Sequence, residues 1–145
     1  MSDYENATAS QARFYALRLK PGQDVVEELR KFVDANKLKA VSIVSVVGSL
    51  TRALLRFANT GVWSEVTGHF EIVSLVGTID VKGEHLHISL SDRTSKTIGA
   101  HFGVGSAVYT TAEITLAEFP DLDFRRELCP QSGWEELIVD KRQIR

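Results

Sequence analysis

The chain has 145 residues, which is enough for one compact domain with its own core and too few for two domains of ordinary size. Its composition, with 43% hydrophobic and 25% charged residues, is typical of a globular protein and excludes a wholly disordered or fibrous chain. The net charge of -2 at pH 7 provides no overall basic field for nucleic-acid phosphates, and the single cysteine excludes an intrachain disulfide and a cysteine-rich zinc site.

The first third of the chain is predicted to contain a flexible segment, a strand and a helix. We expect residues 1–12 to be flexible and residues 13–145 to form the domain. Apolar residues alternate with polar ones from Arg13 until Pro21 and Gly22, which is typical of a strand that ends in a turn. Asp24 and Glu27 have the spacing of a capping box, and apolar residues then recur at helical intervals. This pattern predicts a helix over residues 24–36.

Most of the remaining chain is predicted to form strands. Residues 39–48 and 52–59 read as two strands, and residues 68–81 read as a central strand because both of their faces are apolar. Residues 84–92 and 107–119 are further strands, whereas the tail from 120 to 145 is mixed, with Trp134 and Ile138 expected to pack back on the domain. Six or so strands and one helix predict an α+β domain, a single compact unit built around a mainly antiparallel sheet.

The sequence carries no feature that indicates a membrane protein. Its first ten residues are polar and lack the basic and apolar regions of a secretory signal. The longest nearly apolar stretch, residues 40–50, is far shorter than the roughly 20 residues that span a bilayer. Together with the single cysteine, these features predict a cytoplasmic location, or a nuclear one if the source is eukaryotic.

Three of the four histidines lie in the segment EHLHISLSDRTSKTIGAHFG, residues 84–103. On a strand, His85 and His87 share one face, and Leu86 and Ile88 point to the other. If residues 92 and 96 pair across a three-residue turn, His87 lies directly opposite His101, with the two Cβ atoms about 5 Å apart. A slip of one residue would separate the histidines. One register therefore predicts a cluster of all three.

The cluster has two interpretations. Three neutral imidazoles suit zinc, or nickel or iron, and leave a fourth position open for water or a ligand. Alternatively, the three rings merely form hydrogen bonds on a hairpin, as most histidines do. We favour a metal site, and we expect His69, at the start of another strand, to lie outside it.

Several segments, in this order, resemble the plant and prokaryote conserved (PPC) domain. They are RLKPGQDVVEELRKFV, VVGSL, GHFEIVSLVGTI, HLHISLSD, GAH and TAEI, and they cover roughly Arg13 to Glu118. The resemblance implies a domain whose largely antiparallel sheet is flanked by helices, as in the acetolactate decarboxylase fold, and which assembles as a homotrimer. It also implies that His85, His87 and His101 bind a metal, as in the prokaryotic branch.

The plant branch of this family adds two further implications. Its members carry an AT-hook that binds the minor groove of DNA, but this chain contains no Arg-Gly-Arg-Pro core and so lacks that element. A segment of the plant domain mediates association with other proteins. Its counterpart here, the partner segment, consists of Gly68, His69, Phe70, Glu71, Ile72 and Val73.

Two classes of function follow from the resemblance. The first, which we prefer, is a stand-alone homotrimeric binding module associated with DNA and transcription, whose metal site orders the domain or senses a small ligand. Bulk charge does not support DNA binding, so the contact would need a local patch. The candidates are Arg13, Arg18, Lys20, Lys37 and Lys39, which otherwise form an ordinary solvated face.

The second class is a zinc-dependent enzyme acting on a small hydroxy-keto or similar acid at the open metal position. It would need a general acid or base, for which Glu71 and Glu113 are candidates, and a cation, for which Arg52 and Arg56 are candidates. Each of these residues also suits an ordinary salt bridge on a strand. The fold analogy alone does not establish catalysis, so we name no catalytic residue.

Overall fold

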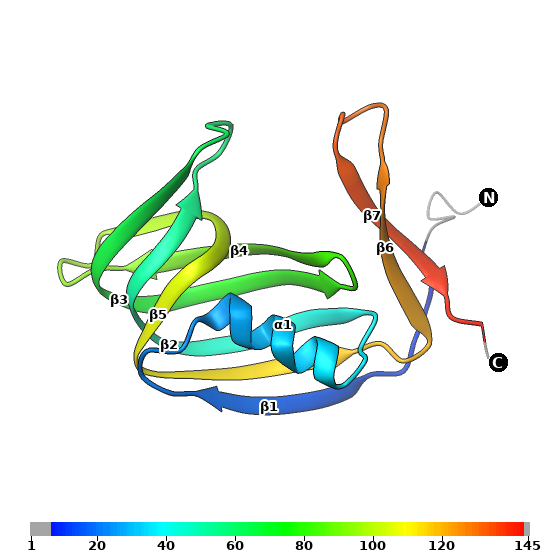
Figure 1. Ribbon diagram of the computed structural model, residues 1–145, viewed down its shortest axis with the longest axis horizontal. Helices are drawn as coiled ribbons and strands as arrows, with labels where there is room; N and C mark the ends of the chain where they lie inside the picture. The colour runs from blue at the N-terminus through cyan, green and yellow to red at the C-terminus, as the bar shows by residue number, and fades with distance from the viewer. Residues whose placement is uncertain (1–6, 144–145) are drawn as a thin grey trace.

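A long, curled antiparallel sheet dominates the computed structural model, which describes residues 7–143 (Figure 1). In spatial order its strands are β1 (Arg13–Leu19), β5 (Thr97–Glu118), β2 (Val41–Arg56), β3 (Trp63–Asp80) and β4 (Gly83–Ser91). A separate hairpin consists of β6 (Leu122–Leu128) and β7 (Glu135–Lys141). The mainly antiparallel sheet is thus confirmed. The expectation of flanking helices is wrong, because the described residues form one helix, α1 (Val25–Ala35).

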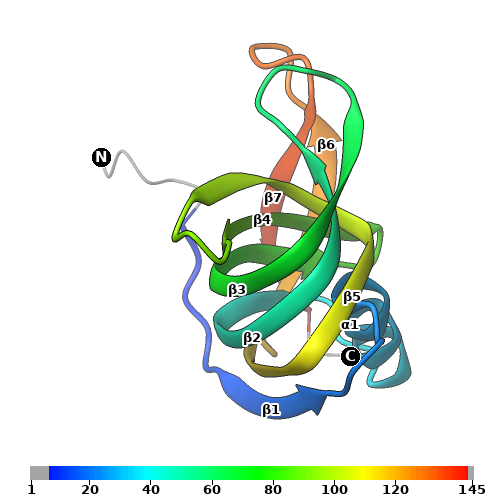
Figure 2. The same ribbon diagram turned by 90° about the vertical axis from the view of Figure 1, so that its left-hand side faces the viewer.

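The sheet closes on itself at one end, because β5 pairs with β4 as well as with β2 (Figure 2). One row of directly opposed residues runs around this closed end. Arg56 lies opposite both Trp63 and His101, His101 lies opposite His87, and His87 lies opposite Val76. Trp63 and Val76 both belong to β3, so the row returns to the strand where it began. Opposed residues share a face, and this row lies on the outside of the curled sheet.

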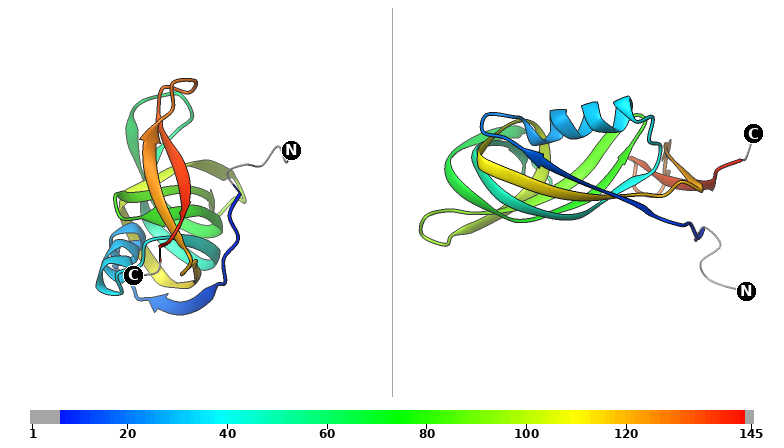
Figure 3. Two further views of the ribbon diagram at one scale, coloured as in Figure 1. Left: turned by 90° about the vertical axis from the view of Figure 1, so that its right-hand side faces the viewer. Right: turned by 90° about the horizontal axis from the view of Figure 1, so that it is seen from below.

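The helix covers the other face of the sheet, and the predicted span of 24–36 agrees with it to within one residue at each end (Figure 3). Asp24 caps it, since one carboxylate oxygen accepts a hydrogen bond from the Glu27 amide at 2.9 Å. The other oxygen accepts from the amides of Gly105 and Ser106, which fixes the helix to β5. No helix among residues 7–143 is long and apolar enough to cross a membrane. Four apolar residues of α1 are buried in the core: Val25, Val26, Leu29 and Val33.

Two of the longest strands were each predicted only in part. The segments expected at 39–48 and 52–59 form one continuous strand, β2, whose pairing with β3 shifts register between Leu50 and Arg52. Gly48 does not end a strand as expected. It allows the Thr111 carbonyl to approach so closely that an added Cβ would lie 2.1 Å from that oxygen. The predicted strand 107–119 is likewise the second part of β5.

The segment predicted as a central strand, residues 68–81, is the second part of β3 and does lie between β2 and β4. Its faces differ from the expectation, because a bulge between Ile72 and Ser74 shifts the pairing with β4. Val73 and Val76 are consequently exposed, although the alternation placed them on opposite faces of a buried strand.

The tail folds into the β6–β7 hairpin, which projects from the sheet (Figures 1 and 3). Trp134 does not pack on the domain as expected, since 68% of its surface is exposed near the tip of the hairpin. Ile138 is half-buried. The hairpin is instead joined to the sheet by Arg126, whose Nε donates to the buried carboxylate of Asp80 at 2.9 Å.

The chain preceding β1 is described from residue 7 onward. Within the segment predicted to be flexible, residues 1–12, the first six positions lie outside the described residues. The side chain of Ser10 and the amide of Gln11 both donate to the Asp121 carboxylate, at 3.2 and 3.0 Å. This part of the segment therefore contacts the start of the β6–β7 hairpin.

Candidate metal centre

The three histidines lie on β4 and β5 in the predicted register, with His87 directly opposite His101. The turn that sets this register spans Asp92 to Lys96, where the Asp92 amide donates to the Lys96 carbonyl at 2.9 Å. The Asp92 carboxylate accepts from the amides of Thr94 and Lys96, and Ser95 adopts a positive φ of 67°. The side chain of Asp92 thus stabilises a turn that contains no glycine.

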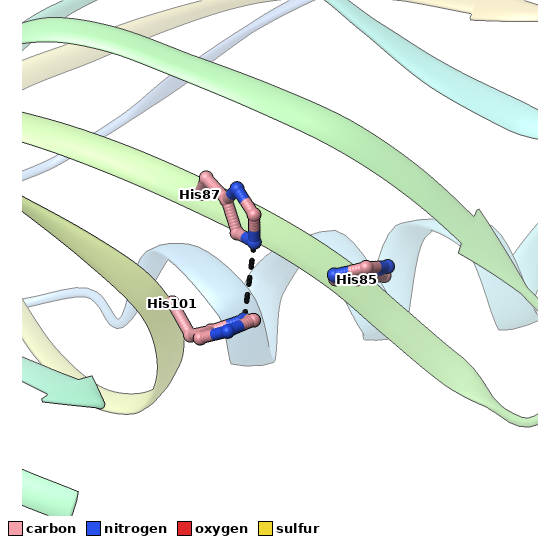
Figure 4. A group of neighbouring side chains, drawn as sticks. All are labelled: His85, His87 and His101. Carbon is pink, nitrogen blue, oxygen red and sulfur yellow. Dashed lines mark hydrogen bonds between the residues drawn. The ribbon is translucent and has the colours of Figure 1, made fainter. Parts of the chain in front are cut away.

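The imidazole rings converge on one point in front of β4 and β5 (Figure 4). One nitrogen from each ring lies within 4.8 Å of the other two, and His87 Nε2 is 3.1 Å from His101 Nδ1. Nitrogens bound to tetrahedral zinc at about 2.0–2.1 Å from the ion are themselves about 3.3 Å apart. The donor set therefore fits a zinc ion after small side-chain rotations, and the three residues leave one coordination position open.

The surroundings favour the neutral, metal-binding form of the rings. Partial burial lowers the pKa of His85 below its ordinary value, and the positive charges of His87 and Arg126 add to the effect. Partial burial also lowers the pKa of His101, followed by the positive charge of Arg56. A neutral imidazole keeps a lone pair for a metal ion, so these shifts support coordination at neutral pH.

A cleft of about 520 Å³ lies beside the cluster, with His85 and His101 among its lining residues. One side is formed by Arg56, the last residue of β2, and by Asn59 of the β2–β3 connection. The opposite side is formed by the β6–β7 hairpin, which contributes Arg126, Trp134 and Glu136. The β2–β3 and β6–β7 hairpins project on the same side of the sheet (Figure 1), and His85 and His101 line the cleft together with residues of both.

Of the four residues proposed for acid–base or electrostatic roles, only Arg56 lies at the site. Glu71 lies opposite Ser91 at the far end of β4, and Glu113 lies opposite Arg18, far along β5 from His101. Arg52 lies opposite Ala107, and its Nε donates to the Gly105 carbonyl. Within one chain, the candidates Glu71, Glu113 and Arg52 therefore do not reach the histidines, because the long strands carry them away.

Sequence reasoning missed the three residues from the β6–β7 hairpin, Arg126, Trp134 and Glu136. The tail, residues 120–145, is predicted only as mixed, although its sequence contains a pattern typical of a hairpin. Apolar residues at 122, 124 and 128 and at 137–139 flank the segment Cys129 to Gly133, which contains a proline and a glycine, and this pattern is typical of two paired strands. That pairing brings Arg126 opposite Leu137, next to Glu136.

His69 lies outside the cluster, as expected, with its ring edge-on to Tyr109 at a centroid distance of 4.7 Å. It belongs to the partner segment, which lies within β3 and is only partly accessible. Gly68, His69, Glu71 and Val73 are exposed, whereas Ile72 is buried and Phe70 packs against the core. The role of this segment in binding another protein stays a prediction.

Comparisons with solved structures confirm the fold. A hypothetical protein from Salmonella enterica is 45% identical and has a TM-score of 0.92, with 94% of this chain and 99% of that chain covered. A metal-containing protein from Archaeoglobus fulgidus (22% identity, TM-score 0.74) covers 95% of this chain and 99% of its own. A plant- and prokaryote-conserved protein from Pyrococcus horikoshii (18%, TM-score 0.71) has the same coverage. The last two comparisons show the fold alone.

Comparisons of sequence lead to the family. Two curated relatives from Synechococcus strains, both named bifunctional protein GlmU, are 40% and 39% identical over 129 and 127 residues. The aligned part covers 89% and 88% of this chain but only 21% and 20% of those proteins, so the chain spans about one fifth of their length. The family model of the Plants and Prokaryotes Conserved (PCC) domain matches residues 6–120 and so includes all three histidines. The chain therefore belongs to the plant and prokaryote conserved domain family that its sequence segments resemble.

Proposed function

We propose that the protein is a binding module that holds a divalent transition-metal ion, zinc in the first place, on His85, His87 and His101. The observation that carries this proposal is the convergence of three imidazole nitrogens within 4.8 Å of one another. The lowered pKa values of His85 and His101 support it, because they keep the ligands neutral. When bound, the metal would supply an electrophilic centre with one position open to a ligand.

Metal analysis of protein purified without an affinity tag tests this proposal. We expect about one metal ion per chain, and we expect the variant His87→Ala to lose it, because two imidazoles are a weak site. His69→Ala is the matched control, since His69 is the one histidine outside the cluster and lies against Tyr109. Metal-free protein, or full metal content in His87→Ala, would contradict the proposal.

We further propose that the module is a homotrimer, as the family resemblance implies. An uncovered apolar strip supports assembly. Val44 and Val47 of β2 and Val73 and Val76 of β3 are each 51% to 61% exposed, on neighbouring strands of the sheet. Val76 lies directly opposite His87, so a subunit interface on this strip would reach the edge of the metal site.

DNA binding is a second candidate function. Two solved structures with this fold, from Bacteroides thetaiotaomicron (21% identity) and Ralstonia eutropha (22%), are described as candidate DNA-binding proteins. The basic residues of this chain offer limited support because they are divided. Arg13 and Lys39 lie near the end of the sheet where Glu118 pairs with Arg13 and Val41, whereas Arg18 and Lys20 lie at the opposite end of β1.

A mobility-shift titration with duplex DNA tests the second candidate. A phosphate-binding surface gives an affinity that falls steeply with salt, with each neutralised phosphate adding about 0.9 to the logarithmic slope. We expect only weak binding, confined to low salt, because the net charge of -2 opposes it. Tight binding that persists at physiological salt would make DNA, and not the metal ligand, the main partner.

A further inference from the structure

The cleft beside the histidines contains charged side chains whose pairing is uneven. Three of its four carboxylates are neutralised: Asp80 by Arg126, Glu135 by Lys82, and Glu84 by Arg30. Arg56 forms no hydrogen bond or ion pair with any residue between 7 and 143, and its guanidinium lies 5.7 Å from the centre of the Trp63 ring. The fourth carboxylate, Glu136, accepts a hydrogen bond from the Ser132 hydroxyl at 2.8 Å and has no other partner among residues 7–143. Arg56 and Glu136 therefore carry the unpaired charges.

These two charges offset each other, so a bound metal ion would determine the net charge of the cleft. Three neutral imidazoles bring no charge to a divalent ion, and its two positive charges stay uncompensated at the open position. A partly desolvated cleft with an excess of two positive charges favours an anion of charge -2 over a neutral or singly charged molecule. The ligand best matched to the site is therefore a dianion.

The arginines on the two sides of the cleft indicate where the two negative charges of the ligand would lie. Arg56 lies directly opposite His101, next to the metal ligands, and Arg126 belongs to the opposite hairpin. Arg126 is held by Asp80 through Nε and by Thr78 through Nη2, at 2.9 and 3.1 Å, which leaves Nη1 without a partner among the described residues. Two separate donors flank the metal, and each guanidinium suits a carboxylate.

We propose that the cleft binds a small dicarboxylate, with one carboxylate on the metal and Arg56 and the other on Nη1 of Arg126. This inference rests on the metal site proposed above. The volume of about 520 Å³ accommodates a molecule with a chain of a few carbon atoms and excludes a folded protein or a duplex. The exposed indole of Trp134 lies at the rim, where it covers the apolar part of the ligand.

Calorimetric titration of metal-loaded protein with three probes tests this assignment. Succinate has two carboxylates, butyrate has the same carbon chain with one, and inorganic phosphate is a dianion without a chain. We expect succinate to bind about tenfold to a hundredfold more tightly than butyrate, which corresponds to one additional charge-assisted contact. We expect phosphate to bind more weakly than succinate, because it carries the charge but cannot reach both arginines.

Single variants separate the two ends of the ligand. Arg126→Gln should lower the affinity for succinate to that for butyrate and leave butyrate binding unchanged. Arg56→Gln should weaken both, with the metal content retained. Arg52→Gln is the matched control, because this arginine of the same strand bonds the Gly105 carbonyl away from the cleft. Circular dichroism and metal analysis of each variant show whether it has folded, and Arg56→Gln tests the inference even if Arg126→Gln does not fold.

The outcomes distinguish this inference from the proposed function. A sample that takes up no metal contradicts the metal site and the inference together. A metal-loaded sample that binds succinate no better than butyrate, or binds phosphate as tightly as succinate, overturns the dicarboxylate assignment alone. Succinate binding that Arg56→Gln leaves unchanged also overturns it.

Discussion

At the scale of single residues, the candidate metal site depends on the protonation of its imidazoles. Protons and metal ions compete for the same lone pairs, so metal binding weakens as the pH falls through the pKa of the ligands. His85 and His101 both have a pKa below the ordinary value of 6.5, because their rings are partly buried beside positive charge. Competition by protons is therefore shifted to a lower pH than for ordinary histidines.

This competition predicts the pH dependence of metal retention. We expect the protein to keep its metal on dialysis at pH 6.5 and to release half of it at a lower pH. The metal-free protein should lose stability as the pH falls from about 6.5, since the unfolded chain, with ordinary histidine pKa values, takes up protons first. Metal content after dialysis and urea unfolding at each pH provide the two measurements. Loss of the metal already at pH 6.5, or a free energy of unfolding that stays constant below that pH, would contradict this expectation.

At the scale of elements, the position of β4 depends on its close approach to β3. Gly77 lies opposite Leu86, and a Cβ added to it would lie 1.9 Å from the carbonyl oxygen of His85. Its φ of 137° is also one that side chains other than glycine rarely adopt. The absence of a side chain at Gly77 thus allows the backbone of His85 to pair with β3.

The variant Gly77→Ala should therefore harm both the fold and the site. We expect it to lower the free energy of unfolding by about 3 kcal/mol, from steric overlap and backbone strain, and to reduce metal affinity by displacing His85. Gly99→Ala is the control next to His101, because its nearest neighbour would be the movable Ser89 hydroxyl at 3.3 Å. We expect that change to cost less than about 1 kcal/mol. Urea unfolding and metal titration would contradict the argument if the two variants behaved alike.

The elements also show how far local sequence patterns can predict this site. Alternation along 84–92 and a polar turn were enough to predict that His87 faces His101, because strand period and turn length fix an antiparallel register. The residue types at the bulge between Ile72 and Ser74 do not indicate an irregular strand, so the sequence did not predict the exposure of Val73. The hairpin beside the site is joined by the contact between Asp80 and Arg126, which are far apart in the chain. The spacing of residues within one segment does not predict contacts between residues that are far apart in the chain.

At the scale of the whole molecule, the apolar strip on β2 and β3 leads to a prediction about assembly. Protein surfaces normally carry apolar residues singly, whereas this strip groups four exposed valines. Burying them between subunits would stabilise an oligomer. We expect a particle of about 48 kDa by light scattering, three times the chain mass of 16.1 kDa.

A charge placed on the strip tests this prediction. Val47→Lys should give a monomer, whereas Val62→Lys, at an equally exposed valine in the β2–β3 connection, should leave the mass unchanged. A monomeric parent protein, or a Val47→Lys variant that keeps the full mass, would show that the strip does not join subunits.

The position of the β6–β7 hairpin relative to the matched family domain has a consequence for recognition. The three histidines fall within residues 6–120, the part that the family model matches, whereas Arg126, Trp134 and Glu136 fall beyond it. Substitutions in the hairpin can change which molecule enters the cleft while every metal ligand stays in place. Changes in this one hairpin would thus alter what the cleft recognises and leave the three histidines as they are.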